Sequence, residues 1–410
     1  MLERHLTRPL LAALADTPVI LLHGARQSGK TTLARRITER EHPARYLTLD
    51  DAGVLAAASA DPVGFVGGLV GPVVLDEVQR VPNLLLAIKS AVDRDRTPGR
   101  FLLTGSANVL LLPKLADALV GRMEILTLWP LSQGELAGTE ERFLDTLYAG
   151  GAIKTRTAVT RAEVIERVVR GGYPEVQPRA PARRDAWYGA YVTTILQRDV
   201  RDLSRVEDLA LLPRVLRLLA GQSAMPLNVS NLSRASAIPY TTLRRYLALL
   251  ETAFLVRTVP AWSANVRHRL VKAPKLVLVD TGLASHLLGA DQERLSRDGE
   301  LLGSMLETFG LMELLKQAGW NETSVELFHF RRHAGREVDI VLEDRRGRVI
   351  GIEVKAAATV SPADFAGLRE LQALAKKRFL RGVLLYIGRE TVPFGDALEA
   401  VPIAAVWGGR

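Results

Sequence analysis

The sequence of 410 residues contains no cysteine, which excludes disulfide bonds, thiolate zinc sites and cysteine nucleophiles. A chain without cysteine is typical of a reducing compartment, so we expect a cytoplasmic protein. The sequence also lacks an uninterrupted apolar run of about 18 residues, and we therefore expect no membrane partner. The first residues carry charges and no small-residue cleavage site, which argues against a secretory signal.

Hydrophobic residues make up 48% of the chain, enough to build real cores, and the length suggests two or three domains. The net charge of +9 is concentrated in one region. Residues 183–275 hold fifteen Lys and Arg against six Asp and Glu, while the remainder is balanced. A basic middle segment indicates a polyanion such as DNA as a partner, although a basic surface that serves only solubility would look the same.

A phosphate-binding loop follows the first apolar run. Residues 18–22 read PVILL, the next residues read HGARQSGKTT, and a helical pattern, LARRITER, comes directly after. This is GxxxxGK[ST] between a strand and a helix, where backbone N–H groups and the helix N-terminus surround phosphates. Lys30 should reach the β- and γ-phosphates, and Thr31 should offer its hydroxyl to Mg²⁺. The residues expected to bind ATP or ADP are Gly24, Ala25, Arg26, Gln27, Ser28, Gly29, Lys30, Thr31 and Thr32.

A second apolar run, residues 72–75, ends in Asp76 and Glu77. A carboxylate at the end of such a strand can hold Mg²⁺, so Asp76 is the expected metal residue. Glu77 is the expected catalytic base, because a carboxylate beside the metal can polarise the attacking water. The pair resembles the Walker B arrangement of NTPases that hydrolyse with their own base.

Two further residues are candidates for the nucleotide site. The strand at residues 100–106 ends in Thr104, Gly105 and Ser106, and Ser106 or Thr104 could contact the γ-phosphate or the water. Arg122 precedes another strand, residues 123–128, and could be an arginine finger in its own chain or in a neighbouring copy. A surface arginine at a strand start is an equally good interpretation of Arg122.

The middle of the chain has the pattern of a DNA-binding helix pair. Residues 227–251 predict a short helix, a turn and a second helix, and a strand and a basic loop follow. Helix-turn-helix followed by a basic hairpin is typical of a winged helix, although such modules also serve as lids or protein contacts. The residues expected to contact DNA are Thr241, Thr242, Arg244, Arg245, Arg267 and Arg269.

The C-terminal part contains a predicted β-hairpin, EVDIVLEDRRGRVIGIEVK, at residues 337–355. The alternation puts Val338, Ile340 and Leu342 on one face, and Asp339 on the other. The turn near Arg346 sets Asp339 opposite Glu353. Two facing carboxylates destabilise a sheet unless a cation lies between them, which favours a metal site. Lys355 and Arg336 could instead neutralise the pair without a metal.

A helix precedes this hairpin and carries Glu307 on an apolar stripe, and a helix and a strand follow it. Helix, strands, helix and strand with these acids is the layout of the PD-(D/E)XK nuclease fold. In that chemistry Asp339 and Glu353 bind Mg²⁺ or Mn²⁺, Lys355 orients the water, and Glu307 assists. Such folds often persist after their chemistry is lost, so the sequence leaves cleavage open.

Taken together, the motifs resemble the bacterial and archaeal AAA-type ATPases, of the ASCE P-loop class, that carry a C-terminal domain of unknown function. The motifs that carry the resemblance are GARQSGKTTLA, VVLDEVQRVPNLL, LLTGSA, LVGRMEILTLWPLSQGE, RGGYPE, TTLRRYLALLE, KAPKLVLVDTGL and GREVDIVLEDRRGRVIGIEVKA. The resemblance implies a P-loop ATPase core, a winged helix and a restriction-endonuclease-like tail, with the nucleotide and nuclease-like residues named above.

We therefore expect an α/β protein with three domains. Residues 1–135 should form an AAA-type ATPase with a parallel sheet and helices on both faces. Residues 136–285 should form a helical and winged-helix DNA-binding domain, and residues 286–410 the nuclease-like domain. The expected function is a Mg²⁺-dependent ATPase coupled to DNA binding and possible cleavage, assembled as a homo-oligomer through the ATPase domain. The alternatives are a nucleotide-switched regulator with an inactive nuclease-like domain, and a signalling ATPase that binds no nucleic acid.

Overall fold

The structure is a computed structural model that describes residues 2–106, 121–151, 153–199, 211–269, 272–332 and 335–408. It divides the chain into two compact units. The first unit comprises Met1–Leu131 and Glu251–Phe254, and the second unit comprises Ser132–Leu250 and Leu255–Arg410. No helix in the described ranges is long and apolar enough to cross a membrane.

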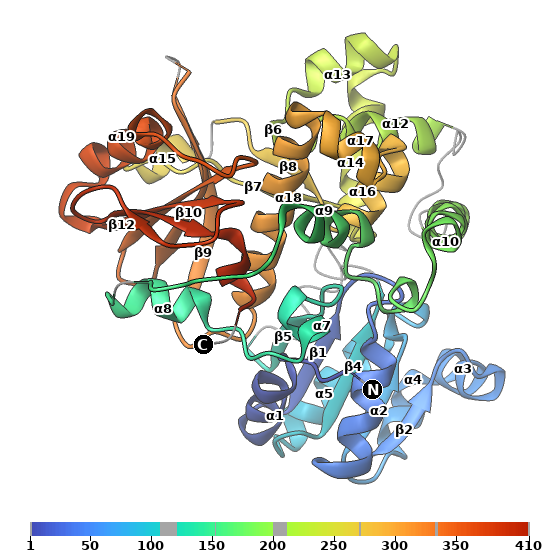
Figure 1. The fold of residues 1–410 in the computed structure, drawn as a ribbon. Coiled ribbons are helices and arrows are strands. Elements are labelled where there is room, and N and C mark those ends of the chain that lie inside the picture. The colour runs from blue at the N-terminus through green and yellow to red at the C-terminus, as the bar shows by residue number, and fades with distance from the viewer. Residues whose placement is uncertain are drawn as a thin grey trace. The chain divides into compact units, whose positions relative to one another are not determined.

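The first unit is built on a five-stranded parallel sheet in the order β2-β3-β4-β1-β5 (Figure 1). Its three central strands, β3, β4 and β1, are short, apolar and buried, as expected of strands covered on both faces. The strands are β1 (Val19–His23), β2 (Arg45–Thr48), β3 (Val73–Asp76), β4 (Phe101–Gly105) and β5 (Met123–Thr127). The helices are α1 (Thr7–Asp16), α2 (Lys30–Arg40), α3 (Ala52–Ala60), α4 (Pro62–Gly67) and α5 (Leu84–Arg94).

Two apolar cores lie on opposite faces of this sheet. One is formed by α3, α4 and α5, with Leu84 and Ile88 of α5 fully buried. The other is formed by α1 and α2, with Leu10 and Ile37 fully buried. The expected parallel sheet with helices on both faces is therefore confirmed. It brings the carboxyl ends of β1, β3 and β4 to one edge, where α/β proteins bind ligands.

The second unit begins with helices and a small antiparallel sheet in the order β6-β8-β7. The helices are α7 (Gln133–Ala137), α8 (Phe143–Ala149), α9 (Arg161–Arg170), α10 (Pro181–Thr194), α12 (Leu212–Ala220), α13 (Val229–Ser236), α14 (Tyr240–Thr252), α15 (Val266–Arg269), α16 (Thr281–Leu288), α17 (Gln292–Arg297) and α18 (Gly299–Gln317). The strands are β6 (Met225–Pro226), β7 (Val256–Val259) and β8 (Lys275–Leu278).

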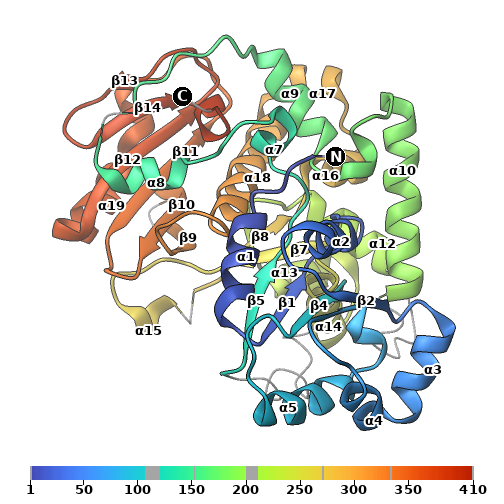
Figure 2. The same cartoon turned by 90° about the horizontal axis from the view of Figure 1, so that it is seen from below.

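A six-stranded mixed sheet, ordered β13-β14-β12-β11-β10-β9, completes the second unit (Figure 2). The strands are β9 (Val325–Arg331), β10 (Glu337–Asp344), β11 (Val349–Lys355), β12 (Phe379–Tyr386), β13 (Val392–Pro393) and β14 (Leu398–Pro402), with α19 (Ala366–Ala375) before β12. β10 and β11 pair from Ile340↔Ile352 to Glu343↔Val349, the register expected from the turn. The strand order along the chain agrees with the predicted helix, strands, helix and strand.

The alternation expected in the hairpin is wrong at one end. A bulge between Val338 and Val341 breaks the period of two in β10. Val338 and Val341 pack in the apolar core with Leu368 and Leu371 of α19. Val354 lies against Gly310 of α18. Both faces of the sheet are thus covered by helices, so neither face of the hairpin is a solvated one.

The predicted three-domain division differs from the observed units. The expected boundary between residues 135 and 136 lies close to the observed one at Leu131 and Ser132. The expected boundary between residues 285 and 286 lies within the second unit. One reason is the connection between β7 and β8. In this connection, the backbone N–H of Trp262 donates to the carbonyl of His329 on β9 (2.6 Å). The Trp262 side chain is fully buried in the core of the C-terminal sheet.

Candidate functional site

The P-loop lies between the end of β1 at His23 and the start of α2 at Lys30. Gly24 and Gly29 have φ angles of 150° and 95°, which side chains rarely adopt. A Cβ on Gly24 would lie 2.1 Å from the carbonyl oxygen of Leu128, so only glycine fits there. The Lys30 ammonium is buried and donates to the carbonyls of Gly24 (3.0 Å) and Ala25 (2.8 Å). The loop thus holds the lysine at the position where phosphates are expected.

The Walker B carboxylate lies beside the P-loop helix. Asp76 ends β3 and accepts hydrogen bonds from the Thr31 hydroxyl at 3.1 and 3.2 Å. Its other partners are the Tyr46 hydroxyl (2.5 Å) and the Thr104 hydroxyl. A carboxylate and a threonine hydroxyl are hard oxygen donors of the kind that Mg²⁺ prefers. Thr31 and Asp76 are therefore suited to hold the metal of a Mg²⁺–nucleotide complex, and their metal role stays a prediction.

Glu77 lies next to Asp76 in a left-handed conformation with φ of 62°. Such a backbone is strained for a residue other than glycine, and strain of this kind gathers at functional sites. Its carboxylate accepts hydrogen bonds from the Ser106 hydroxyl (3.1 Å) and from the Gln79 amide. The Gln79 amide also donates to Ser106 (2.9 Å). The structure thus brings Ser106 to the expected base, while Thr104 contacts Asp76.

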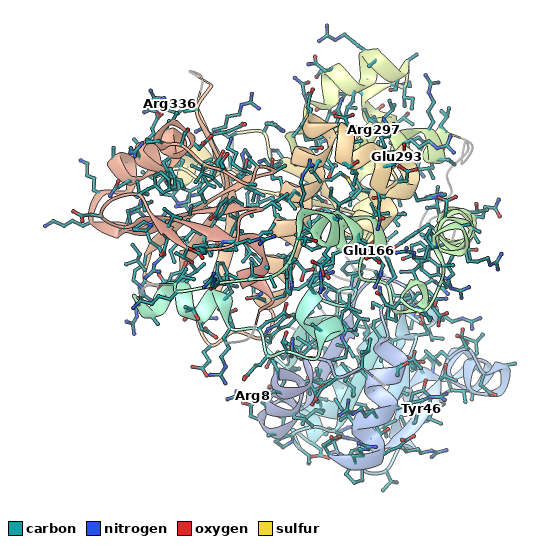
Figure 3. All side chains as sticks on the ribbon, in the orientation of Figure 1. Arg8, Tyr46, Glu166, Glu293, Arg297 and Arg336 are labelled. Carbon is teal, nitrogen blue, oxygen red and sulfur yellow. The ribbon has the colours of Figure 1, made fainter. Side chains whose placement is uncertain are left out.

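Two residues near the nucleotide site escaped sequence reasoning. Arg4 is buried and donates to the carbonyls of Ser28 (2.6 Å) in the P-loop and Trp129 (2.7 Å). Tyr46, labelled on the first unit in Figure 3, orients Asp76. Burial and the Asp76 hydrogen bond raise the pKa of Tyr46 to about 12, so its hydroxyl stays a donor. Neither residue belongs to a motif, and an arginine near the N-terminus gives no signal of its own.

The expected role of Arg122 as an arginine finger in its own chain is wrong. Arg122 precedes β5, which pairs with β1 in parallel from Met123↔Val19 to Thr127↔His23. The start of β5 therefore lies at the edge of the sheet opposite the P-loop. The Arg122 guanidinium forms an ion pair with Asp93 near the end of α5.

The C-terminal acids come together, but a lysine lies among them. Glu307 on α18 and Asp339 on β10 both face the ammonium of Lys275, which belongs to β8. Lys275 forms an ion pair with Glu307 and lies 3.7 Å from Asp339, and its side chain is only 4% exposed. Asp339 also accepts the backbone N–H of Val354 (2.9 Å). Lys275 was not among the candidate residues, so sequence reasoning missed this contact.

The charges of this cluster depend on one another. Burial raises the pKa of Glu307 to about 8, with the neighbouring Asp339 carboxylate adding to the effect. Burial opposes the charge on Lys275, but Glu307 and Asp339 outweigh it and raise the pKa of the ammonium. Burial also raises the pKa of Glu353 well above its usual range. The negative charge of the cluster is therefore reduced by the ammonium of Lys275 and by the raised pKa values of Glu307 and Glu353.

This arrangement does not fit the expected metal site. No three His, Asp or Glu side chains within the described ranges converge as metal ligands. Lys355 lies 3.6 Å from one oxygen of Glu353, and the other oxygen is buried without a hydrogen-bond partner. Arg336, the other residue expected to neutralise the pair, lies 3.7 Å from Glu370 instead and is labelled in Figure 3. The tethered ammonium of Lys275 takes the role that the prediction gave to a divalent cation.

The residues expected to contact DNA divide into two groups. Thr241, Arg244 and Arg245 are exposed and Thr242 is partly exposed, all on the first two turns of α14. Arg267 is also exposed. The prediction that Arg269 contacts DNA is wrong, because its guanidinium is paired with Glu343 (2.7 Å) and donates to the carbonyl of Ser263 (2.8 Å). It also lies over the Phe328 ring, so it stabilises the fold and does not present its charge to a phosphate.

A buried polar network follows directly after the first unit. Glu141 accepts hydrogen bonds from the Ser132 hydroxyl (2.5 Å) and the N–H of Gly134 (2.9 Å). Glu313 of α18 accepts the N–H of Gln133 (2.7 Å) and pairs with Lys316 (2.6 Å). Burial, with Glu313 adding its charge, raises the pKa of Glu141 to about 8. The sequence LSQGE was part of the resemblance, but its hydrogen bonds to Glu141 and Glu313 were not predicted.

Three protein families match separate parts of the chain. Residues 16–137 match a family described as AAA domain. Residues 161–294 match a domain of unknown function (DUF8612), and residues 302–406 match another (DUF4143). The first match agrees with the P-loop, the strand order and the Walker B pair. The first unit is therefore an AAA-type P-loop domain, and its fold implies nucleotide binding.

Related proteins extend the match to nearly the whole chain. An uncharacterized protein of Mycobacterium tuberculosis is 32% identical over 398 residues, which cover 96% of this chain and 82% of the relative. This chain belongs to the same family. An uncharacterized protein of Mycobacterium bovis matches to the same extent. One of Haemophilus influenzae is 26% identical over 256 residues, covering 59% of this chain and 57% of the relative.

Among solved structures, this family member is similar to the Walker-type ATPase PABY2304 of Pyrococcus abyssi. The TM-score is 0.44, the sequence identity is 16%, and the overlap covers 70% of this chain and 96% of that one. It is also similar to RuvB of Thermotoga maritima, described as a Holliday junction branch migration motor. There the TM-score is 0.29, the identity is 18%, and the overlap covers 63% of this chain and 90% of that one.

Proposed function

We propose that this protein is a Mg²⁺-dependent ATPase whose nucleotide cycle is coupled to DNA binding. The observation that carries the hydrolytic part is the arrangement of Thr31, Asp76, Glu77 and Ser106 around the P-loop lysine. The bound Mg²⁺ would supply charge stabilisation at the phosphates, held through Thr31 and Asp76. Glu77 would accept the proton of the attacking water, with Ser106 and Gln79 fixing the orientation of its carboxylate.

The DNA-binding part rests on the first half of the second unit. Its element order, α12, β6, α13, α14, β7 and β8, is the order of a winged helix, and it supports that interpretation. Exposed arginines lie along three of its helices, Arg214 and Arg217 on α12, Arg234 on α13, and Arg244 with Arg245 on α14. Guanidinium groups displayed in this way suit phosphate contacts, and α14 would be the recognition helix.

A single aromatic residue offers a route for the coupling. α14 ends at Thr252, and Phe254 follows two residues later. Phe254 belongs to the first unit and has a φ angle of 56°. The Phe254 ring packs edge-on against His23 at 5.2 Å between centroids, and against Trp129 at 5.6 Å. His23 precedes the first P-loop glycine. A change in the P-loop on nucleotide binding would therefore be transmitted through Phe254 to the end of α14.

We do not extend the proposal to DNA cleavage, because Lys275 occupies the acidic cluster. The nuclease-like fold would then serve to bind or to hold the winged helix, as in the nucleotide-switched regulator considered from the sequence. Arg122 keeps one possible role as an arginine finger, in the nucleotide site of a second copy. That role requires the homo-oligomer expected through the ATPase domain.

The test is ATP hydrolysis measured with and without duplex DNA at several salt concentrations. DNA should change the turnover of the wild type, and the double variant Arg244→Ala/Arg245→Ala should bind DNA more weakly, with a salt slope reduced by about 2. Phe254→Leu should keep DNA binding and the turnover without DNA, but DNA should no longer change its turnover. Turnover that DNA never changes, with no DNA binding at low salt, would refute the coupling and favour the signalling ATPase.

A further inference from the structure

A cavity of about 340 Å³ lies between α10 and α16, and all the residues that line it belong to the second unit. Most of its lining is apolar. Pro181, Ala182 and Tyr188 come from α10, and Gly282 and Ser285 come from α16. A volume of this size is in the range of sites that bind small molecules.

One charged group in this cavity forms no ion pair with any residue in the described ranges. Arg184 of α10 lines the cavity and is only 8% exposed, yet its Nη1 atom is buried without a hydrogen-bond partner. Leaving a buried donor of a charged group unpaired is costly, and such groups are rare in folded proteins. Burial lowers the pKa of the Arg184 guanidinium, and the nearby charge of Arg170 lowers it further. Arg184 is therefore a buried cation whose Nη1 atom has no acceptor among the described residues.

The acids close to the cavity already have partners. Asp185 pairs with His286 of α16 at 2.6 Å. Asp291 caps α17 by accepting the N–H of Arg294 (2.8 Å). A second polar atom remains, since the Oγ of Ser285 is buried without a partner. The lining is mostly apolar but also includes Asp185, Asp291 and His286, and within it the guanidinium of Arg184 and the hydroxyl of Ser285 form a pair of donors for one small acceptor group.

We propose that this cavity binds a small organic anion. Its carboxylate or phosphate group would accept hydrogen bonds from Arg184 and Ser285, and its apolar or aromatic body would lie against the ring of Tyr188 and the neighbouring apolar side chains. The ring of Tyr188 is held in place because its hydroxyl donates to Asp280 (3.0 Å) and to the carbonyl of Arg170 (3.0 Å). The proposal does not depend on nucleotide hydrolysis or on DNA.

Thermal unfolding of the whole protein with model anions tests the proposal. Benzoate and phenyl phosphate distinguish a carboxylate from a phosphate ligand, and benzyl alcohol is the uncharged control. At roughly ten times its dissociation constant, an anion that binds should raise the Tm of the wild type by about 3 °C. Benzyl alcohol should not do so. In Arg184→Met the increase should disappear, because the substitution keeps the volume but removes the charge.

The Tm of the ligand-free variants shows whether Arg184 has only a structural role. Arg184→Met should have a Tm equal to or above that of the wild type, since an unpaired buried cation is removed. Ser285→Ala should fold normally and weaken anion binding several-fold by calorimetry. The proposal is overturned if neither anion stabilises the wild type, if Arg184→Met keeps the full stabilisation, or if ligand-free Arg184→Met unfolds at a clearly lower temperature.

Discussion

The protein contains two groups of carboxylates that the sequence predicted to be functional, and their surroundings differ. In the first unit, Asp76 and Glu77 accept hydrogen bonds from the hydroxyls of Thr31, Tyr46 and Ser106. In the second unit, Glu307 and Asp339 face the buried ammonium of Lys275. Neutral donors leave the negative charge available for a metal ion, whereas a tethered ammonium already compensates it.

The difference shows that residue type and strand position do not by themselves make a metal site. Both groups belong to a recognised motif, and each includes a strand residue, Asp76 of β3 and Asp339 of β10. What separates them is one residue that approaches from another element, Lys275 on β8. The comparison therefore predicts that the first group binds Mg²⁺ together with nucleotide. The second group should bind a divalent cation only after Lys275 is removed.

The largest expected effect is that of Lys30→Ala on nucleotide turnover. The ammonium lies inside the loop and is the charge nearest to where phosphates bind, so its loss should reduce ATP hydrolysis by roughly 1,000-fold. Phosphate release assays would measure this loss, and fluorescent ATP would show whether binding fails as well. Normal turnover in this variant would refute the identification of the nucleotide site.

Glu77→Gln should have the next largest effect. The amide keeps the shape of the side chain but cannot accept a proton, so turnover should fall by roughly 100-fold while nucleotide binding persists. Single-turnover kinetics beside equilibrium binding would separate the two quantities. A variant that binds ATP and hydrolyses it at the wild-type rate would show that another group is the base.

Lys275→Met tests the other half of the comparison. Removing the ammonium leaves Glu307 and Asp339 buried without their cation, so the free energy of unfolding should fall by about 3 kcal/mol. Millimolar Mn²⁺ should recover part of this loss in the variant and none in the wild type, because the carboxylates can then bind the ion. Chemical denaturation with and without Mn²⁺ measures both effects.

Lys272→Met is the matched control for that experiment, since Lys272 is exposed on the same segment. It should change neither the stability nor the response to Mn²⁺. Equal stabilisation of the wild type and Lys275→Met by Mn²⁺ would mean that Lys275 does not close the cluster. Mn²⁺-dependent DNA cleavage by the wild type, lost in Asp339→Asn, would restore the nuclease interpretation.

A further expected effect is a change in the pH dependence of stability. The folded-state pKa of Glu141 is about 8, above the ordinary value of 4.5, so the folded protein retains a proton that the unfolded chain releases. This contribution to stability is complete below pH 4.5 and is lost as the pH rises through 8, with a slope of up to about 1.4 kcal/mol per pH unit. Glu141→Gln should flatten the slope across this window. An unchanged slope in urea unfolding would contradict the assignment.

Local sequence was sufficient wherever function depends on neighbours along the chain. GxxxxGK[ST] after an apolar run predicted the P-loop, and the acids after the third strand predicted the Walker B pair. The turn near Arg346 predicted the register in which Ile340 pairs with Ile352 and Glu343 with Val349. In each case the spacing along the chain fixes which groups meet, because a strand, a turn or a helix start has a fixed geometry.

Contacts between distant segments could not be predicted in this way. Arg122 was a candidate for the nucleotide site, but parallel pairing of β5 with β1 places it at the opposite edge of the sheet. Arg269 was a candidate for DNA, but it is paired with Glu343 of β10. An exposed and a buried arginine look alike in a sequence, since burial depends on which elements pack together.

The sequence by itself determined that this protein has an AAA-type nucleotide site, because the residues of that site are grouped in short motifs around adjacent strand ends. Only the tertiary structure decided the state of the C-terminal acids. Lys275 and Glu307 are 32 residues apart, and Lys275 and Asp339 are 64 apart. Whether such groups meet depends on how β8, α18 and β10 pack, and that packing sets whether the carboxylates face a metal ion or an ammonium.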